Sequence, residues 1–338
     1  MPRRRLLMLG GAAAAWWLLG ARTSWALPRA APGPASSGPS ASPAEADPPD
    51  PRLQGMTRVS SGPWRLLSDA DHLLQSMLLQ VLPNTLERVG RWARTLGLQP
   101  AAPGDLRVLL FAERERFLAF GRDDGFDDPW ALGYYSPTAH RCVLCAPAET
   151  PGYRAAAARL HGAPASAAVA ALRDRLSDWT RSAFLTTATH EAAHQSLFAC
   201  QVQRRGAEYP AWLSEGMACA FETERLHGDA GPHMPQPLRR ERLLNRMQDG
   251  DAMPLQALVA GMSRPRGSEA EVTAWYDQSA LFTAWLATCR RTELARYLEL
   301  HARTGMPPTV RTRLEAFTEV VGDAGTVERA WRLWLRPA

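Results

Sequence analysis

One five-residue segment constrains this chain more than any other, since residues 190–194 read His-Glu-Ala-Ala-His. In a helix, residues four apart lie on the same face, so the imidazoles of His190 and His194 can reach one metal ion. Glu191 then lies beside that ion, where its carboxylate can accept a proton from water. Two histidines on a helix can also be ordinary polar residues, but this spacing around a glutamate favours a metal site.

The residues around this segment favour a helix. No proline or glycine occurs between Ser166 and Arg205, so nothing in that stretch breaks the backbone. Ser177 or Asp178 is the predicted N-cap, just ahead of an apolar stripe at helical spacing. We therefore expect both histidines to lie on a helix that begins near Trp179.

A catalytic zinc site needs a third protein ligand and one open position. In metzincins the motif continues to a glycine and a third histidine, but Leu197 and Cys200 occupy those positions here. The thiolate of Cys200 is one alternative, although a lone cysteine is more often a small apolar residue. Glu215 is the stronger candidate, because it is a charged residue within a mostly apolar predicted helix that follows Pro210. An ion pair with an arginine is its alternative role.

The segment around Glu215 reads W-L-S-E-G-x-A at residues 212–218. H-E-x-x-H followed by this segment resembles the gluzincin clan of zinc metallopeptidases. More closely, it is similar to a family of bacterial secreted, largely uncharacterised proteins of the peptidase-MA type. The close resemblance extends from Thr186 to Thr288, and a looser resemblance in element order reaches back to Pro63.

This resemblance implies a role for each residue of the site. His190, His194 and Glu215 would bind one Zn²⁺ ion per chain, and Glu191 would be the general base for a zinc-activated water. Glu222 lies seven residues after Glu215. It either orients a metal ligand or forms a solvated ion pair.

Tyr276 is the candidate donor to the oxyanion of the tetrahedral intermediate. It begins a Y-x-Q-S segment that resembles a recurrent element after the active-site helices of these proteins. The alternative is a tyrosine packed on the core with its hydroxyl at the surface. His227 and His233 lie in a Gly/Pro-rich loop, where they either line the cleft or are exposed to solvent.

The N-terminal sequence predicts export. Residues 1–26 have the layout of a signal peptide, with three arginines at 3–5, an apolar run at 6–20 and a small-x-small site at 24–26. Both Sec and twin-arginine export fit this pattern, and an uncleaved anchor is the alternative. Residues 27–62 are rich in Pro, Ala and Ser and predict a disordered linker. We expect a periplasmic or extracellular protein with no membrane span after cleavage.

Net charge and cysteine content bear on three further features: a nucleic-acid partner, a structural zinc knuckle and a disulfide. The net charge of +5 falls to +1 when the four arginines of residues 1–26 are removed, which leaves a nucleic-acid partner without support. Among the five cysteines, Cys142 and Cys145 are three apart on a predicted strand and should point to opposite faces. A structural zinc knuckle is therefore not expected, while one disulfide is compatible with an exported chain.

The order of predicted elements is typical of an α+β, zincin-like fold. A strand at Trp64–Leu67, a helix at Asp69–Leu96 that Pro83 could interrupt, and a strand at Leu106–Phe111 come first. A short helix at Arg114–Phe120 and a hairpin over residues 131–145 follow, and after Pro164 the pattern is helical. We therefore expect one metallopeptidase domain over 63–338, with a sheet-containing part at 63–160, a helical part at 161–338 and the metal between them.

The sequence thus predicts an exported zinc metallopeptidase that acts on a peptide or protein substrate. Two alternatives remain: an amidase that acts on peptidoglycan peptides, and a non-catalytic periplasmic binding module of the same fold. The intact motif residues favour an enzyme. The substrate, the cleavage specificity and the oligomeric state are not predicted.

Overall fold

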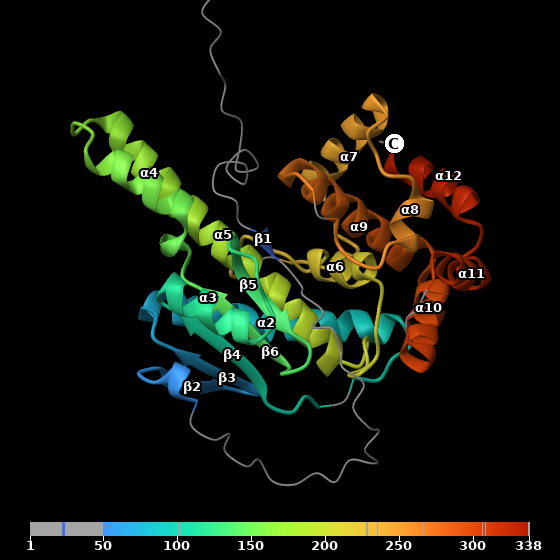
Figure 1. The fold of residues 1–338 in the computed structure, drawn as a ribbon, viewed down its shortest axis with the longest axis horizontal. Helices are drawn as coiled ribbons and strands as arrows, with labels where there is room; N and C mark the ends of the chain where they lie inside the picture. Colours follow the sequence, from blue (N-terminus) through green and yellow to red (C-terminus); the bar gives the residue numbers. More distant parts are fainter. Residues whose placement is uncertain are drawn as a thin grey trace, which may run out of the picture.

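The computed structural model describes residues 22–23, 50–100, 102–227, 229–234, 236–265, 267–305, 307 and 309–336. Within them the protein is mixed α+β, as predicted, with a sheet at one side and a group of helices at the other (Figure 1). Two long helices, α2 (His72–Thr95) and α5 (Ala167–Ala199), pass from one part to the other.

The sheet has the strand order β1-β5-β6-β4-β3-β2. Its three central pairings are parallel between β3 and β4, parallel between β4 and β6, and antiparallel between β6 and β5. β2 pairs antiparallel with β3, and the two-residue β1 pairs parallel with β5. The strands are β1 (Arg22–Thr23), β2 (Thr57–Ser61), β3 (Trp64–Ser68), β4 (Leu106–Phe111), β5 (Ala131–Ser136) and β6 (Arg141–Cys145).

The two faces of the sheet pack on different helices. One face, including Leu110 and Cys142, forms a core with α2 and α5. The other face, including Phe111 and Cys145, packs on Phe117 and its neighbours in α3 (Arg114–Asp123). Cys142 and Cys145 therefore point to opposite faces, as their spacing predicts, and all five cysteines of the chain are free thiols.

The helical part encloses a second core between α6 and α9, to which the C-terminal halves of α2 and α5 contribute. α5 thus belongs to both cores, since Ala192 packs on the sheet side and Ala193 on the helical side. The other helices are α4 (Pro151–His161), α6 (Ala211–Cys219), α7 (Pro237–Asp249), α8 (Leu255–Ala260), α9 (Glu269–Cys289), α10 (Arg291–Thr304), α11 (Val310–Val320) and α12 (Ala324–Leu335).

Two boundaries differ from the prediction, and the course of α2 at Pro83, which the sequence left open, is now defined. β2 (Thr57–Ser61) lies in the stretch assigned to the linker, because it is a largely exposed edge strand without an alternating apolar pattern. α5 begins at Ala167 with Ser166 as its N-cap, about a dozen residues before the predicted start, since its first three turns face solvent and carry no apolar stripe. α2 continues through Pro83 without interruption.

Most of the predicted export segment lies outside the described residues. Of the predicted signal peptide at 1–26 only residues 22–23 are described, and of the predicted linker at 27–62 only residues 50–62. Within the described part of the chain, no helix combines the length and apolar character needed to cross a membrane.

Candidate metal centre

The histidine motif lies in the most enclosed part of α5. Every residue from Ala183 to Phe198 is buried, because β5 and β6 of the sheet, α2 and α6 all pack against the helix. His190, Glu191 and His194 are each about 1 % exposed. Buried polar groups need hydrogen-bond partners, and buried charges need an opposite charge or a metal ion.

Glu215 reaches the motif from α6, which begins after Pro210 as the sequence predicts. The next residue, Gly216, explains how α6 can lie so close to α9. A Cβ atom at this position would lie 2.3 Å from Thr283 Oγ1 and 2.4 Å from the carbonyl oxygen of Ser279. The glycine of the W-L-S-E-G segment therefore permits a close helix contact that holds Glu215 against α5.

The three expected ligands meet at one point. His190 Nε2 lies 3.2 Å from His194 Nε2 and 3.1 Å from Glu215 Oε2, and His194 Nε2 lies 3.7 Å from Glu215 Oε2. In a tetrahedral zinc site with bonds of about 2.0–2.1 Å, ligand atoms are roughly 3.3 Å apart. The arrangement of these donor atoms therefore fits a zinc ion, and they form one of two groups in the described residues that could hold a metal.

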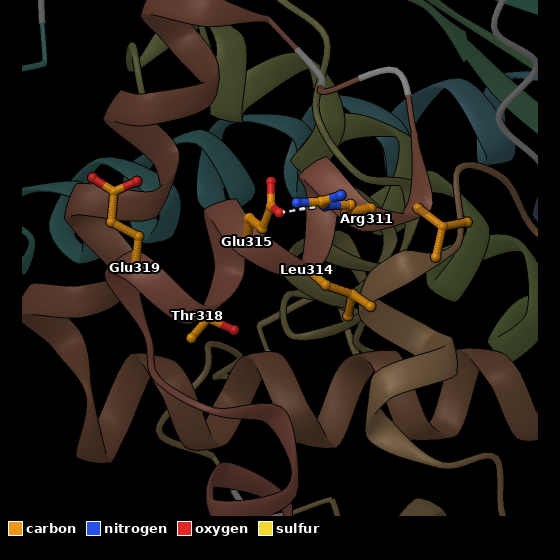
Figure 2. Close-up of a pocket in the computed structure, with 6 residues that line it drawn as sticks. Arg311, Leu314, Glu315, Thr318 and Glu319 are labelled. Carbon is orange, nitrogen blue, oxygen red and sulfur yellow. Dashed lines mark hydrogen bonds and ion pairs between the residues drawn. The ribbon is translucent and has the colours of Figure 1, made fainter.

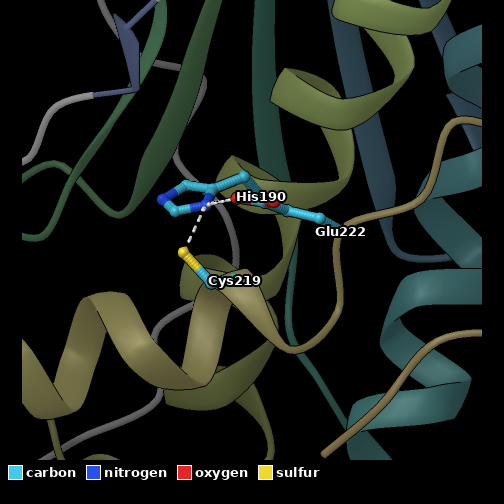
Figure 3. A group of neighbouring side chains, drawn as sticks. All are labelled: His190, Cys219 and Glu222. Carbon is cyan, nitrogen blue, oxygen red and sulfur yellow. Dashed lines mark hydrogen bonds and ion pairs between the residues drawn. The ribbon is translucent and has the colours of Figure 1, made fainter. Parts of the chain in front are cut away.

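The two ring nitrogens of His190 face different glutamates, Nδ1 facing Glu222 and Nε2 facing Glu215. Nδ1 lies 2.9 Å from Glu222 Oε1, and Figure 3 shows Glu222 and Cys219 next to this nitrogen. If neutral His190 donates its Nδ1 proton to Glu222, the Nε2 lone pair faces the Glu215 carboxylate. Two lone pairs at this distance repel, so a positive species must lie between them: a proton in the metal-free protein or a metal ion.

The pKa values of His190 and Glu215 indicate that the point between these two side chains attracts positive charge. Burial alone lowers the pKa of His190, but contacts with Cys219, Glu215 and Glu222 outweigh it and raise the pKa well above its usual value. Burial raises the pKa of Glu215, yet His194 and His190 lower it to about 2. Glu215 is therefore ionised, and the metal-free site carries a proton on His190.

Glu222 is itself held by a network of charged side chains, of which Asp277 is buried and the others are half-buried. Arg239 of α7 contacts Glu222 Oε2, and its Nη1 lies 2.9 Å from Asp277 Oδ1 of α9. Arg242 adds two hydrogen bonds of 2.6 Å to the same aspartate. Burial raises the pKa of Glu222, but Arg239 and His190 lower it to about 2. Glu222 thus accepts from His190 Nδ1 and also pairs with Arg239, so it combines features of both expected roles.

The second possible metal group comprises His190, Cys219 and Glu222. It fits a metal less well because burial raises the pKa of the Cys219 thiol to about 11, whereas metals bind the thiolate. Cys219 is better described as a weak polar contact of His190.

Glu191 lies between α5 and the sheet. The backbone N–H of Tyr135 in β5 donates a hydrogen bond to its carboxylate, while Oε1 has no hydrogen-bond partner among the described residues. Burial raises the pKa of Glu191 to about 8, against the opposing effect of His190. A carboxylate with a pKa in this range can both accept and return a proton near neutral pH.

Tyr276 also lies at this site. Its ring centroid is 6.4 Å from that of His190, and burial followed by the Glu215 charge raises the pKa of its hydroxyl well above the usual value. Arg264 forms a hydrogen bond with Tyr276. Because a guanidinium only donates, the phenol oxygen of Tyr276 is the acceptor in this hydrogen bond.

The remaining sequence candidates lie elsewhere. Cys200 ends α5 and packs in the helical core, so it is an apolar filler and no metal ligand. His227 and His233 are exposed, and neither belongs to a possible metal group.

Three residues that the sequence did not suggest contribute to the site. The ring of Tyr135 stacks on that of His194 with centroids 6.0 Å apart, and Arg239 and Asp277 support Glu222. For these residues, the one indication in the sequence is Asp277, an aspartate within the buried run of α9.

Comparison with known proteins adds one finding. Residues 184–307 match a family model described as "Protein of unknown function (DUF1570)". This segment extends from the buried half of α5 to just beyond α10, so it includes all three candidate ligands, Glu191 and Tyr276. Comparisons with curated proteins and with solved structures gave no match.

Proposed function

We propose that this protein is an exported zinc metallopeptidase of the gluzincin type with a zincin-like fold. The observation that carries the proposal is the convergence of His190 Nε2, His194 Nε2 and Glu215 Oε2 at distances of 3.1–3.7 Å. A zinc ion bound there would act as a Lewis acid and make a water molecule more acidic. The signal-peptide pattern of residues 1–26 supports export.

Glu191 is the general base of the proposed reaction. Its unpartnered Oε1 is available to take the proton of the attacking water, and its raised pKa allows it to return that proton to the leaving amine. Tyr276 would donate its hydroxyl proton to the oxyanion that develops on the substrate carbonyl. Glu222 contributes by orienting His190.

The sheet offers a place for an extended peptide. On one side β5 pairs with β6, and on the other the two described residues of β1 pair with Ala131 and Gly133. Tyr134 to Ser136 follow on the same strand, next to Glu191. A substrate that continues the sheet along this edge would present its backbone to the site.

The test is digestion of a peptide library by the purified full chain, with and without a chelator. The proposal predicts about one zinc ion per chain and cleavage that stops with the chelator and returns with added zinc. Cleavage that is independent of metal would refute the mechanism. A zinc-loaded protein that cleaves no peptide would instead favour a non-catalytic binding module.

A further inference from the structure

Arg264 connects the two parts of the molecule next to the candidate metal centre. It lies between α8 and α9, and its Nη2 donates a hydrogen bond to Asp128 Oδ2 at 3.2 Å. Asp128 belongs to the sheet-containing part and comes shortly before β5, which begins at Ala131. Arg264 also donates to the hydroxyl of Tyr276 in α9, which lies beside His190. One guanidinium therefore contacts a carboxylate of the sheet-containing part and the tyrosine of the site.

Asp128 is itself held in place. Its Oδ1 accepts a hydrogen bond from the backbone N–H of Trp130 at 3.0 Å, and its Oδ2 faces Arg264. The chain just after Asp128 is anchored by Arg114, which is 4 % exposed and donates to two backbone carbonyl oxygens of this segment. The side chains of Arg264 and Asp128 are 27 % and 9 % exposed, so water screens their ion pair less than a surface pair. Asp128 therefore fixes the position of Arg264.

The charge of Arg264 acts on the Tyr276 hydroxyl. Burial lowers the pKa of Arg264, but Tyr276 and Asp128 outweigh it and raise the pKa above its usual value, so the guanidinium is charged. Accepting a hydrogen bond does not use the proton of a phenol, and hydrogen bonds in a chain strengthen one another. A tyrosine that accepts from a cation is therefore a stronger donor to a negatively charged oxygen.

We propose that Arg264 is a positioning residue of the candidate active site, which directs the Tyr276 hydroxyl towards the metal centre and strengthens it as a donor. This role rests on the proposed function, in which Tyr276 donates to the oxyanion. Asp128 holds Arg264 and lies just before β5, the strand proposed to pair with the substrate. The same ion pair thus fixes the Tyr276 hydroxyl relative to the edge along which the substrate would lie.

A hollow of about 740 Å³ on α11 supports no comparable proposal. It is lined by residues of that helix alone, among which Arg311 already pairs with Glu315 at 2.7 Å (Figure 2). Its lining residues, all within the described part of the chain, include no buried polar atom that lacks a partner. Arg264 differs because its two contacts lead directly to the candidate site.

The test is a double-mutant cycle on the zinc-loaded full chain, measured by calorimetric titration with acetohydroxamate, a small oxyanion that binds zinc. Arg264→Met and Tyr276→Phe should each weaken binding by roughly 3–10-fold, the usual range for one lost hydrogen bond. The double variant should bind about as weakly as Tyr276→Phe alone, because Arg264 acts through the hydroxyl. Two losses that multiply in the double variant would overturn the proposal.

Two further variants separate positioning from a general structural effect. Arg264→Lys keeps a positively charged donor and should bind acetohydroxamate within about threefold of wild type. Arg290→Met is the matched control, because Arg290 pairs with Glu293 at 3.1 Å at the opposite end of α9 from Tyr276. The zinc content of all variants should equal that of wild type. A loss of affinity in Arg290→Met as large as in Arg264→Met would contradict the proposal.

Hydrolysis provides a second readout. With a peptide identified in the library digest, Arg264→Met should lower kcat by about tenfold and change KM little, because the donor acts on the oxyanion and not on the bound substrate. A raised KM with an unchanged kcat would contradict a positioning role. If wild type binds zinc and acetohydroxamate but cleaves no peptide, the proposed hydrolysis is wrong, and the binding cycle alone decides the role of Arg264.

Discussion

His190 Nδ1 lies 2.9 Å from Glu222 Oε1, on the opposite side of the ring from Glu215. This hydrogen bond determines which nitrogen of His190 can bind a metal. With Nδ1 donating to Glu222, only Nε2 can be a ligand, and it is Nε2 that lies next to His194 and Glu215. Glu222 also connects the site to α7 through Arg239.

Loss of the Glu222 charge should weaken zinc binding without removing a ligand. We expect Glu222→Gln to lower zinc affinity by roughly 10–100-fold, as is typical when the partner of a metal-binding histidine is changed. Competition with a chromogenic chelator measures this affinity. Glu224→Gln is the matched control, because Glu224 is exposed two residues away. Equal affinities for the two variants would show that Glu222 does not orient the ligand.

Zinc affinity should fall as the pH falls. Burial lowers the pKa of His190, but Cys219, Glu215 and Glu222 outweigh it, so the metal-free protein carries a proton there that zinc must displace. Below this raised pKa, each decrease of one pH unit should weaken apparent affinity about tenfold for one released proton. Titration in two buffers of different ionisation enthalpy measures the proton release directly. An affinity that does not change between about pH 6 and pH 8 would contradict a protonated His190.

Glu191→Gln should separate metal binding from catalysis. The variant keeps the shape of the side chain and all three ligands, so its zinc content should equal that of wild type. Peptide hydrolysis should fall by about 10²–10⁴-fold, the usual contribution of a general base. Glu208→Gln, at an exposed glutamate between α5 and α6, should leave both properties unchanged. Retained hydrolysis in Glu191→Gln would exclude Glu191 as the base.

Gly216→Ala should destabilise the contact between α6 and α9. The added methyl group would lie 2.3 Å from Thr283 Oγ1 and 2.4 Å from the Ser279 carbonyl, so one helix must move. We expect a loss of about 1–3 kcal/mol in the free energy of unfolding, together with weaker zinc binding because Glu215 precedes this residue. Gly104→Ala is the control, since no atom lies within 4 Å of a Cβ there. Equal stability of both variants by denaturant titration would contradict this explanation.

The sequence predicts the parts of this site that lie close together along the chain. The spacing of His190, Glu191 and His194 requires only a helix, and the strand at Leu106–Phe111 and the hairpin are indicated by local apolar patterns. Glu215 could be predicted from the sequence because a charged residue within an apolar helix needs a partner. These predictions depend on a few neighbouring residues and little on the rest of the fold.

Features that depend on tertiary packing could not be predicted in the same way. Arg239 and Asp277 are 38 residues apart and come together only because α7 packs on α9. The start of α5 was placed too late because its first turns are exposed and need no apolar stripe. Arg264 is one of many arginines in the sequence, and only its contacts with Asp128 and Tyr276 distinguish it.

The central claim is that His190, His194 and Glu215 bind one zinc ion. Anomalous diffraction from crystals of the purified protein, measured on both sides of the zinc absorption edge, tests it most directly. We predict one zinc peak within about 2.0–2.2 Å of His190 Nε2, His194 Nε2 and a Glu215 oxygen. A peak beside His190 Nδ1, Cys219 and Glu222, or no zinc peak in zinc-supplemented crystals, would contradict the account.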